Sequence, residues 1–160
     1  MKIFDAYRPL EYQQMLFDEE YQKVKVVNPN LSEEEIRRIV FVSVYPPNLD
    51  AEKPPPHSTG GALDLTVMNA SGDELNMGCA YCEFGDRMYT NSDLISETQR
   101  ENRIVLLSAM VKTRFANFPG EWWHFMYGER EYAAYMTKIL CISLNAIYGR
   151  AKIEQGDKYG

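Results

Sequence analysis

The sequence lacks the features of a membrane protein, a disulfide-bonded scaffold or a nucleic-acid-binding protein. No apolar run approaches the roughly 18 residues of a membrane-spanning helix, and the Met-Lys-Ile-Phe-Asp start has no apolar signal-peptide stretch. The three cysteines are odd in number and unevenly spaced, which favours free thiols in a reducing compartment. Lysine and arginine total 17 against 23 aspartates and glutamates, giving a net charge of −6, whereas nucleic-acid binding needs clustered basic residues. We therefore expect a cytoplasmic protein with no membrane span and no nucleic-acid partner.

Histidine is also scarce, and both histidines lie in segments that carry an acid. His57 precedes Asp64 in His-Ser-Thr-Gly-Gly-Ala-Leu-Asp, and Glu121 precedes His124 in Glu-Trp-Trp-His. A catalytic zinc needs three protein ligands and one open position, and two imidazoles with one carboxylate meet that need. We predict that His57, Asp64 and His124 bind one Zn²⁺ per chain. Glu121 is then the general base, because one carboxylate must stay free of the metal to take a proton from its water.

Turn residues next to these motifs indicate how each ligand is presented. The Gly-Gly pair at 60–61 lets the backbone turn before an alternating segment, so we expect His57 on a loop and Asp64 on a strand. A Pro-Gly turn at 119–120 precedes an aromatic run that favours a strand, with Glu121 as its first residue. Neighbouring strand residues face opposite ways, so one tryptophan of this run is expected in the core and the other beside the site.

The whole pattern predicts one α+β domain over residues 1–160. We expect a mainly antiparallel sheet of four or five strands that carries the zinc ligands. The helices are expected to pack on one face of this sheet. Further strands are expected at 2–7, 74–79 and 144–148, and helices at 11–27, from a cap at Ser32 to about residue 42, at 96–113 and at 129–140. A polar tail is expected from residue 150. The helix at 96–113 has apolar residues spaced for one buried face, namely Ile104, Leu107 and Val111, widened by Val105, Leu106 and Met110.

Three motifs spread over nearly the whole chain carry a resemblance to a known family. They are Asp-Ala-Tyr-Arg-Pro at 5–9, His-x-x-Gly-x-Ala-x-Asp-Leu-Thr at 57–66 and Glu-Trp-Trp-His at 121–124. With them the chain resembles the D-alanyl-D-alanine dipeptidases, zinc enzymes of the vancomycin-resistance type. The doubled tryptophan is typical of these dipeptidases and distinguishes them from the related D,D-carboxypeptidases.

The resemblance implies a role for each motif residue in hydrolysis of the D-alanyl-D-alanine dipeptide. The family's zinc ligands match His57, Asp64 and His124, its general base matches Glu121, and the residue that stabilises its tetrahedral intermediate matches Arg8. A guanidinium suits that last role, because it offers a rigid fork of donors and stays charged. Taken without the other motifs, Arg8 would be a surface residue beside a turn.

The chain departs from the family pattern at positions near the substrate. A serine usually stands two residues before the first histidine, where this chain has Pro55. After Met-Gly the family usually reads Thr-x-Phe-Asp, whose aspartate helps to hold the substrate's ammonium group, whereas this chain reads Cys-Ala-Tyr-Cys-Glu at 79–83. We expect Glu83 to take over that contact one position later, with Tyr81 as a second substrate-binding residue. Family members also have several dozen residues before the Tyr-Arg-Pro motif, and we expect that part of the fold to be missing here.

Other functions stay open at this point. The site would suit a D,D-carboxypeptidase or another hydrolase of peptidoglycan peptides, or a catalytically weak zinc-binding module. Two histidines and one carboxylate also form the facial triad of non-haem iron oxygenases, although those enzymes need no base such as Glu121. The Cys-x-x-Cys spacing at 79–82 would fit a redox pair or half of a zinc knuckle, but no second cysteine pair accompanies it. Homo-oligomerisation is left open.

Overall fold

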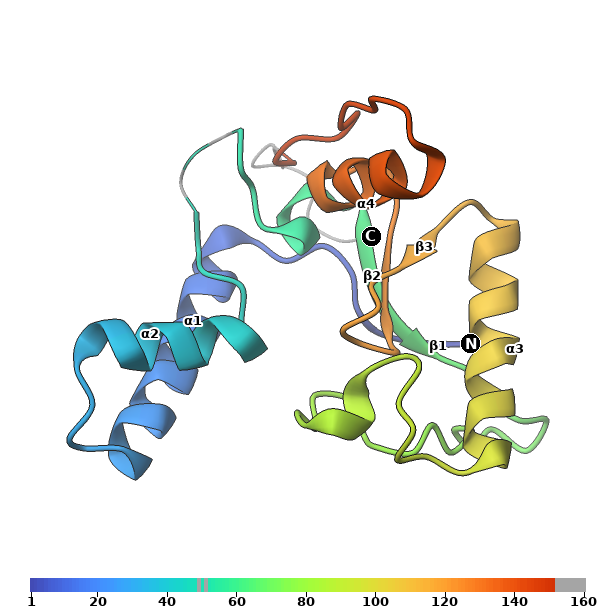
Figure 1. The fold of residues 1–160 in the computed structure, drawn as a ribbon, viewed down its shortest axis with the longest axis horizontal. Helices are drawn as coiled ribbons and strands as arrows, with labels where there is room; N and C mark the ends of the chain where they lie inside the picture. The colour runs from blue at the N-terminus through green and yellow to red at the C-terminus, as the bar shows by residue number, and fades with distance from the viewer. Residues whose placement is uncertain (49, 51, 152–160) are drawn as a thin grey trace, which may run out of the picture.

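A four-stranded antiparallel sheet forms the centre of the fold (Figure 1). The computed structural model describes residues 1–48, 50 and 52–151, and its strands are β1 (Lys2–Asp5), β2 (Ala62–Thr66), β3 (Ala116–Asn117) and β4 (His124–Met126). Their order is β1-β2-β4-β3, and the register of the central pair places Asp64 opposite His124. Side chains of directly opposed residues start about 5 Å apart. The pairing of β2 with β4 therefore brings together two proposed ligands that are 60 residues apart in sequence.

The helices confirm the predicted α+β class. They are α1 (Leu10–Val27), α2 (Glu33–Ser43), α3 (Glu97–Lys112) and α4 (Arg130–Leu140). α2 begins as the sequence indicates, because the Ser32 side chain accepts from the backbone of Glu35 while the Glu35 carboxylate accepts from the backbone of Ser32. α3 begins with the same reciprocal cap between Ser96 and Gln99.

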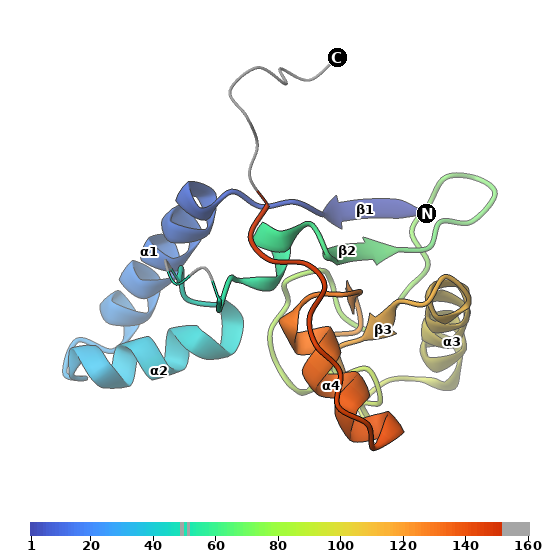
Figure 2. The ribbon, with the colours of Figure 1, turned by 90° about the horizontal axis from the view of Figure 1, so that it is seen from above.

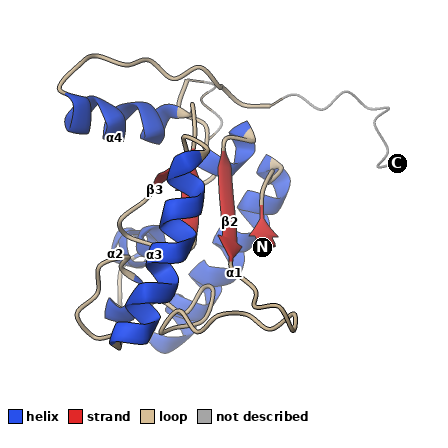
Figure 3. Cartoon of the chain, turned by 90° about the vertical axis from the view of Figure 1, so that its right-hand side faces the viewer, coloured by secondary structure: helices blue, strands red, loops and turns tan. Residues whose placement is uncertain are grey.

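The helices lie on different sides of the sheet rather than in one layer. α1 and α2 lie at one end of the molecule and α3 at the other (Figures 1 and 2). α1 packs on α2 around a small apolar cluster of its own, formed by Phe17, Ile36 and Val40. α3 runs alongside the strands, as Figure 3 shows from its side, and α4 follows β4 after a short turn at Gly128.

The main core joins α3 to the sheet. Its buried members are apolar residues of the strands, of α3 and of the loops between them: Leu65, Met77, Met88, Leu106, Met110, Trp122, Trp123 and Phe125. Both tryptophans are buried, and Trp123 also lines the site cavity described below. The expectation of one tryptophan beside the site and one in the core holds only in part, because both belong to the core and both lie in the turn before β4 rather than on a strand.

The predicted buried face of α3 is correct at Leu106 and Met110, and Leu107 is partly buried against the core, but the prediction is wrong at Ile104, Val105 and Val111. Ile104 and Val111 are 52% and 54% exposed, whereas Leu106 and Met110 are buried together with Arg103. The spacing of apolar residues gave no signal that the charged Arg103 would be buried. The structure places it inside, where backbone carbonyls bind it.

Two predicted strands do not form. In residues 74–79 only Glu74 makes a single bridge, to Met68, and Gly78 has a φ of +96°, a left-handed conformation that ends an extended segment. Residues 144–148 are an irregular segment whose Ile147 and Tyr148 N–H groups donate to the carbonyl of Gly128. The Tyr148 ring fills the space that a Cβ on Gly128 would need.

Among the described residues, no helix has the length and apolar character needed to cross a membrane. Most of the polar tail expected from residue 150 lies outside the described residues.

Candidate active site

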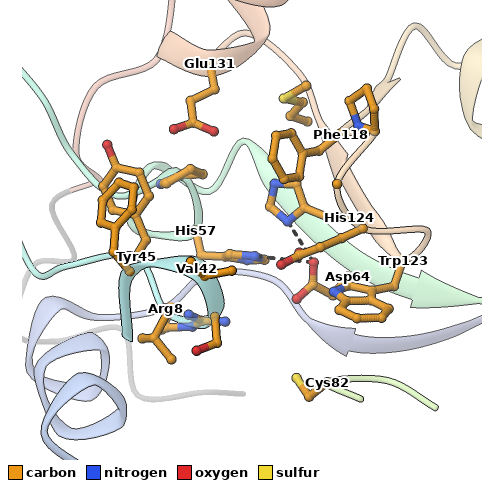
Figure 4. Close-up of a pocket in the computed structure, with 18 of the residues that line it drawn as sticks. Arg8, Val42, Tyr45, His57, Asp64, Cys82, Phe118, Trp123, His124 and Glu131 are labelled. Atoms are coloured by element: carbon orange, nitrogen blue, oxygen red, sulfur yellow. Dashed lines mark hydrogen bonds and ion pairs between the residues drawn. The ribbon is translucent and has the colours of Figure 1, made fainter. Parts of the chain in front are cut away.

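The structure brings His57, Asp64 and His124 together as one buried group. His57 lies on a short 3-10 helix, Pro56–Thr59, where a loop was expected, and Asp64 and His124 lie on β2 and β4. His57 Nε2 is 3.4 Å from Asp64 Oδ1, and His124 Nδ1 is 2.9 Å from the same oxygen. One ligand atom from each side chain lies within 4.8 Å of the other two, and Figure 4 shows the three side chains converging.

The contacts of His57 fix which of its ring nitrogens faces the group. Its Nδ1 lies 2.8 Å from the carbonyl oxygen of Ala6. A carbonyl only accepts, so Nδ1 is the donor to Ala6 and Nε2 is the ring nitrogen that faces Asp64. Metal-binding histidines are commonly oriented by such a contact at the other ring nitrogen.

Asp64 is held as a carboxylate. Tyr81 donates its hydroxyl to Asp64 Oδ2 at 3.1 Å, while Oδ1 faces the two imidazoles. Burial would raise the pKa of Asp64, but hydrogen bonds and charge from His124 and His57 outweigh it and hold that pKa well below its usual value. Burial would likewise lower the pKa of His124, but its hydrogen bond to Asp64 raises it.

The donor set fits a small divalent metal ion. Two ligand atoms at 2.0–2.2 Å from a tetrahedral zinc lie about 3.4 Å apart. The observed separations of 3.4 and 2.9 Å from Asp64 Oδ1 therefore need only small adjustments. Two nitrogens and one carboxylate oxygen also leave a fourth position for water.

Glu121 enters the site from the turn before β4 rather than from a strand. Its N–H donates to the carbonyl of Phe118, and its own carbonyl accepts from the N–H of His124 and the side chain of Asn117. The strand begins only at His124, because this compact turn occupies the preceding residues. Burial raises the pKa of Glu121, and the charge of Asp64 acts in the same direction. Glu121 lines the same cavity as the His-Asp-His group, although it is not one of that group's three residues.

Arg8, which follows β1, also lines this cavity. Its Nε donates to Asp5 Oδ2 at 2.8 Å, its Nη2 donates to the same oxygen, and its Nη1 donates to Gln13 Oε1 at 2.9 Å. Its backbone N–H donates to the carbonyl of His57, which joins the Arg8 segment to the ligand-bearing 3-10 helix.

The cavity has a volume of about 650 Å³ and extends beyond the ligand group (Figure 4). Its walls come from the end of α2, the loop around residue 82, the turn before β4 and one face of α4. The aromatic residues among them are Phe41, Tyr45, Tyr81, Phe84, Phe118, Trp123 and Tyr135.

Comparison with known proteins gives this site a family. The family described as D-ala-D-ala dipeptidase matches residues 1–143. The chain belongs to the D-Ala-D-Ala dipeptidase family. It is 33% identical over 150 residues to a D-alanyl-D-alanine dipeptidase of Synechocystis, covering 82% of this chain and 60% of that protein. It is 28% identical over 127 residues to the Escherichia coli protein of the same name, covering 77% and 52%. The chain thus spans about half the length of the curated relatives it matches.

The residues expected to replace the dipeptidase family's ammonium contact lie in different places. Tyr81 lines the cavity and bonds Asp64, but Glu83 is not among the lining residues. The Glu83 carboxylate is exposed, accepts the backbone N–H of Ala80 and pairs with Arg87 at 2.8 Å. Cys82 lines the cavity in place of Glu83 with a φ of +59°, and its thiol is free. The tight turn at Cys82 directs Glu83 away from the site.

Several residues of the site escaped the sequence analysis. Gln13 is 1% exposed and bonds Arg8, and the end of α2 together with Glu131 of α4 lines the cavity. Figure 4 shows the Glu131 carboxylate directed into the cavity. The only sequence signal for Gln13 was its position five residues after Arg8, on the side of the helix that buries Phe17.

Proposed function

We propose that this chain is a single catalytic domain that hydrolyses D-alanyl-D-alanine or a closely related dipeptide with Zn²⁺ held by His57, Asp64 and His124. The observation that carries the proposal is the buried His-Asp-His group with Glu121 in the same cavity. The family match supports the substrate class. A structural zinc site is normally closed by four protein ligands, whereas this group has three and faces a cavity.

Each polar group of the site has a task in peptide hydrolysis. A bound Zn²⁺ would polarise the scissile carbonyl and lower the pKa of its water to about 7. Glu121 takes a proton from that water and passes it to the leaving amine, a role that its raised pKa suits. Arg8 lines the same cavity with a positively charged guanidinium, so it stabilises negative charge on the former carbonyl oxygen.

Glu121→Gln tests this mechanism most directly, because it keeps the size of the side chain and removes the base. We expect near-normal zinc content, measured by elemental analysis, and a turnover of D-alanyl-D-alanine lower by roughly two to four orders of magnitude. Glu101→Gln, on the exposed surface of α3, is the matched control. Loss of zinc along with activity would make Glu121 a ligand. Unchanged turnover would remove it from the mechanism, and iron in anaerobically purified protein would favour an oxygenase.

A second candidate, cleavage of longer peptidoglycan peptides, is favoured by the placement of Glu83. A dipeptidase must hold a free ammonium group, and the acid expected to do so is paired with Arg87 outside the cavity. The cavity is also larger than a dipeptide with two methyl side chains requires. Comparing D-alanyl-D-alanine with its N-acetylated form decides between the two. Equal cleavage of both would replace the dipeptidase assignment with the longer substrate.

A further inference from the structure

Gln13 is a buried polar side chain at the wall of the cavity. It is 1% exposed, and both the oxygen and the nitrogen of its amide make hydrogen bonds. Its Oε1 accepts from Arg8 Nη1, and its Nε2 donates to the backbone carbonyl of Tyr45, 32 residues away. Arg8 can only donate and a carbonyl can only accept, so the amide has one orientation that satisfies both partners.

Asp5 alone does not fix the orientation of the Arg8 guanidinium. Arg8 Nε and Nη2 both donate to one oxygen, Asp5 Oδ2, because Asp5 Oδ1 accepts the N–H of Ala6. Two bonds to a single oxygen let the guanidinium pivot about that atom, whereas a two-oxygen fork would hold it in plane. The bond from Nη1 to Gln13 is a third, separate anchor that removes this freedom.

These three hydrogen bonds leave part of the Arg8 guanidinium free to bind a substrate. A guanidinium has five N–H groups, and Asp5 and Gln13 take three of them. One N–H remains on each terminal nitrogen of Arg8, a residue that lines the cavity. Gln13 makes its hydrogen bond to Arg8 as a neutral group. A carboxylate in its place would put a second negative charge beside Arg8 and weaken its attraction for an oxyanion.

We infer that Gln13 is a positioning residue that orients Arg8 toward the reacting carbonyl and ties this orientation, through the carbonyl of Tyr45, to the segment after α2. The inference rests on the proposed function of Arg8. Tyr45 and Val44 of this segment line the cavity, together with the last two residues of α2, Val42 and Ser43. Gln13 thereby connects the α1–α2 pair, which has its own apolar cluster, to the chemistry at the sheet.

Gln13→Met tests the inference, since methionine has a similar length and makes neither hydrogen bond. We expect kcat for D-alanyl-D-alanine to fall roughly 10- to 100-fold, the usual effect of a misplaced group, while KM changes less than about twofold. In an Arg8→Ala background the same substitution should have no further effect, because the group it positions is gone. The matched control is Gln14→Met, one position along α1, whose side chain is exposed and bonds Asp18.

A nuclear magnetic resonance readout keeps this test independent of turnover. The anchored Arg8 should show separate Nη–H signals, identified by their loss in Arg8→Ala, and Gln13→Met should merge them through faster rotation. If the native chain cleaves no peptide but the signals depend on Gln13, the proposed function fails and the positioning stands. Equal kinetic effects of Gln13→Met with and without Arg8, or unchanged Arg8 signals, overturn the positioning. Should Gln13→Met fail to fold, Gln13→Glu keeps the acceptor for Arg8, and normal kcat in that variant would overturn the requirement for a neutral group.

Discussion

Arg103 allows the sharpest prediction about how the cavity wall is held. It is 4% exposed on α3, and no carboxylate among the described residues pairs with it. Instead its Nε donates to the carbonyl of Met77 at 2.8 Å, its Nη1 to Tyr89 at 2.6 Å and Thr90 at 3.2 Å, and its Nη2 to Arg87 at 2.7 Å. One side chain therefore satisfies four carbonyls of the irregular segment 77–90, which contains Tyr81 and Cys82 of the cavity wall.

The effect of Arg103→Met follows from these four bonds. Methionine fills part of the volume and offers no donor, so all four carbonyls lose a charged partner. Hydrogen bonds to charged groups contribute about 1.5–3 kcal/mol each, and their simple sum would approach the whole stability of a domain, about 5–15 kcal/mol. The segment can open and let water reach the carbonyls, which limits the loss. We expect a decrease of about 3–5 kcal/mol in the free energy of unfolding, as when one partner of a buried ionic contact is removed.

Urea denaturation measures this loss. With an m-value of about 2 kcal/mol/M, the midpoint should fall by about 2 M. Limited proteolysis of the folded variant should cut first within 77–90, because that segment loses its anchor. Arg38→Met is the matched control, since Arg38 is exposed on α2 and only pairs with Glu34. A midpoint for Arg103→Met equal to that of the control would refute the reasoning, as would first cuts outside 77–90.

Two further predictions concern the ligand group. Tyr81→Phe removes the donor to Asp64 Oδ2 and should weaken zinc binding about 10- to 100-fold, measured by competition with a chelator, and unchanged affinity would show that the hydroxyl has no role. In the metal-free protein, the raised pKa of His124 adds stability that is complete below its unfolded value of about 6.5 and is lost as pH rises through the folded pKa. The lowered pKa of Asp64 adds stability that is complete above about pH 4 and is lost as pH falls through the folded pKa. Metal-free stability should therefore be highest between about pH 4 and 6.5, while zinc affinity should rise with pH through the folded pKa of His124 because zinc displaces that proton. Thermal unfolding with chelator and zinc titrations at several pH values check both trends, and metal-free stability that rises from pH 6 to 8 would contradict them.

The grouping of His57, Asp64 and His124 could be anticipated because much of its information is local. The Gly-Gly turn at 60–61 and the Pro-Gly turn at 119–120 place Asp64 and His124 near the start of adjacent strands, and antiparallel pairing then sets them opposite each other. The class of fold and the starts of α2 and α3 followed from alternation, helical spacing and capping residues, which are also local.

Two of the errors, at the buried face of α3 and at the strand expected for 74–79, involve one buried polar side chain, that of Arg103. Hydropathy treats Arg103 as an exposed residue, but the buried face of α3 includes it beside the expected Leu106 and Met110, while Ile104 is half exposed. The strand expected at 74–79 fails in the same region, because Gly78 turns the chain and the carbonyl of Met77 bonds Arg103 instead of a strand. Hydropathy scales rate one residue at a time. They therefore cannot predict that a buried charged side chain, rather than a neighbouring strand, will hydrogen-bond the backbone carbonyls.

Gln13 and Arg103 also explain how a small sheet supports a large cavity. Asp64 and His124 lie on strands, but a large part of the cavity wall is irregular chain outside the sheet. α1 and α3 each contribute one buried polar side chain that bonds the backbone of such chain, Gln13 to Tyr45 and Arg103 to the segment 77–90. These contacts join residues 32 and 26 positions apart, so the wall can vary in sequence while its anchors stay on helices. Changes of substrate should therefore arise at wall residues such as Cys82, which no anchor requires, before they arise at the residues of the ligand group.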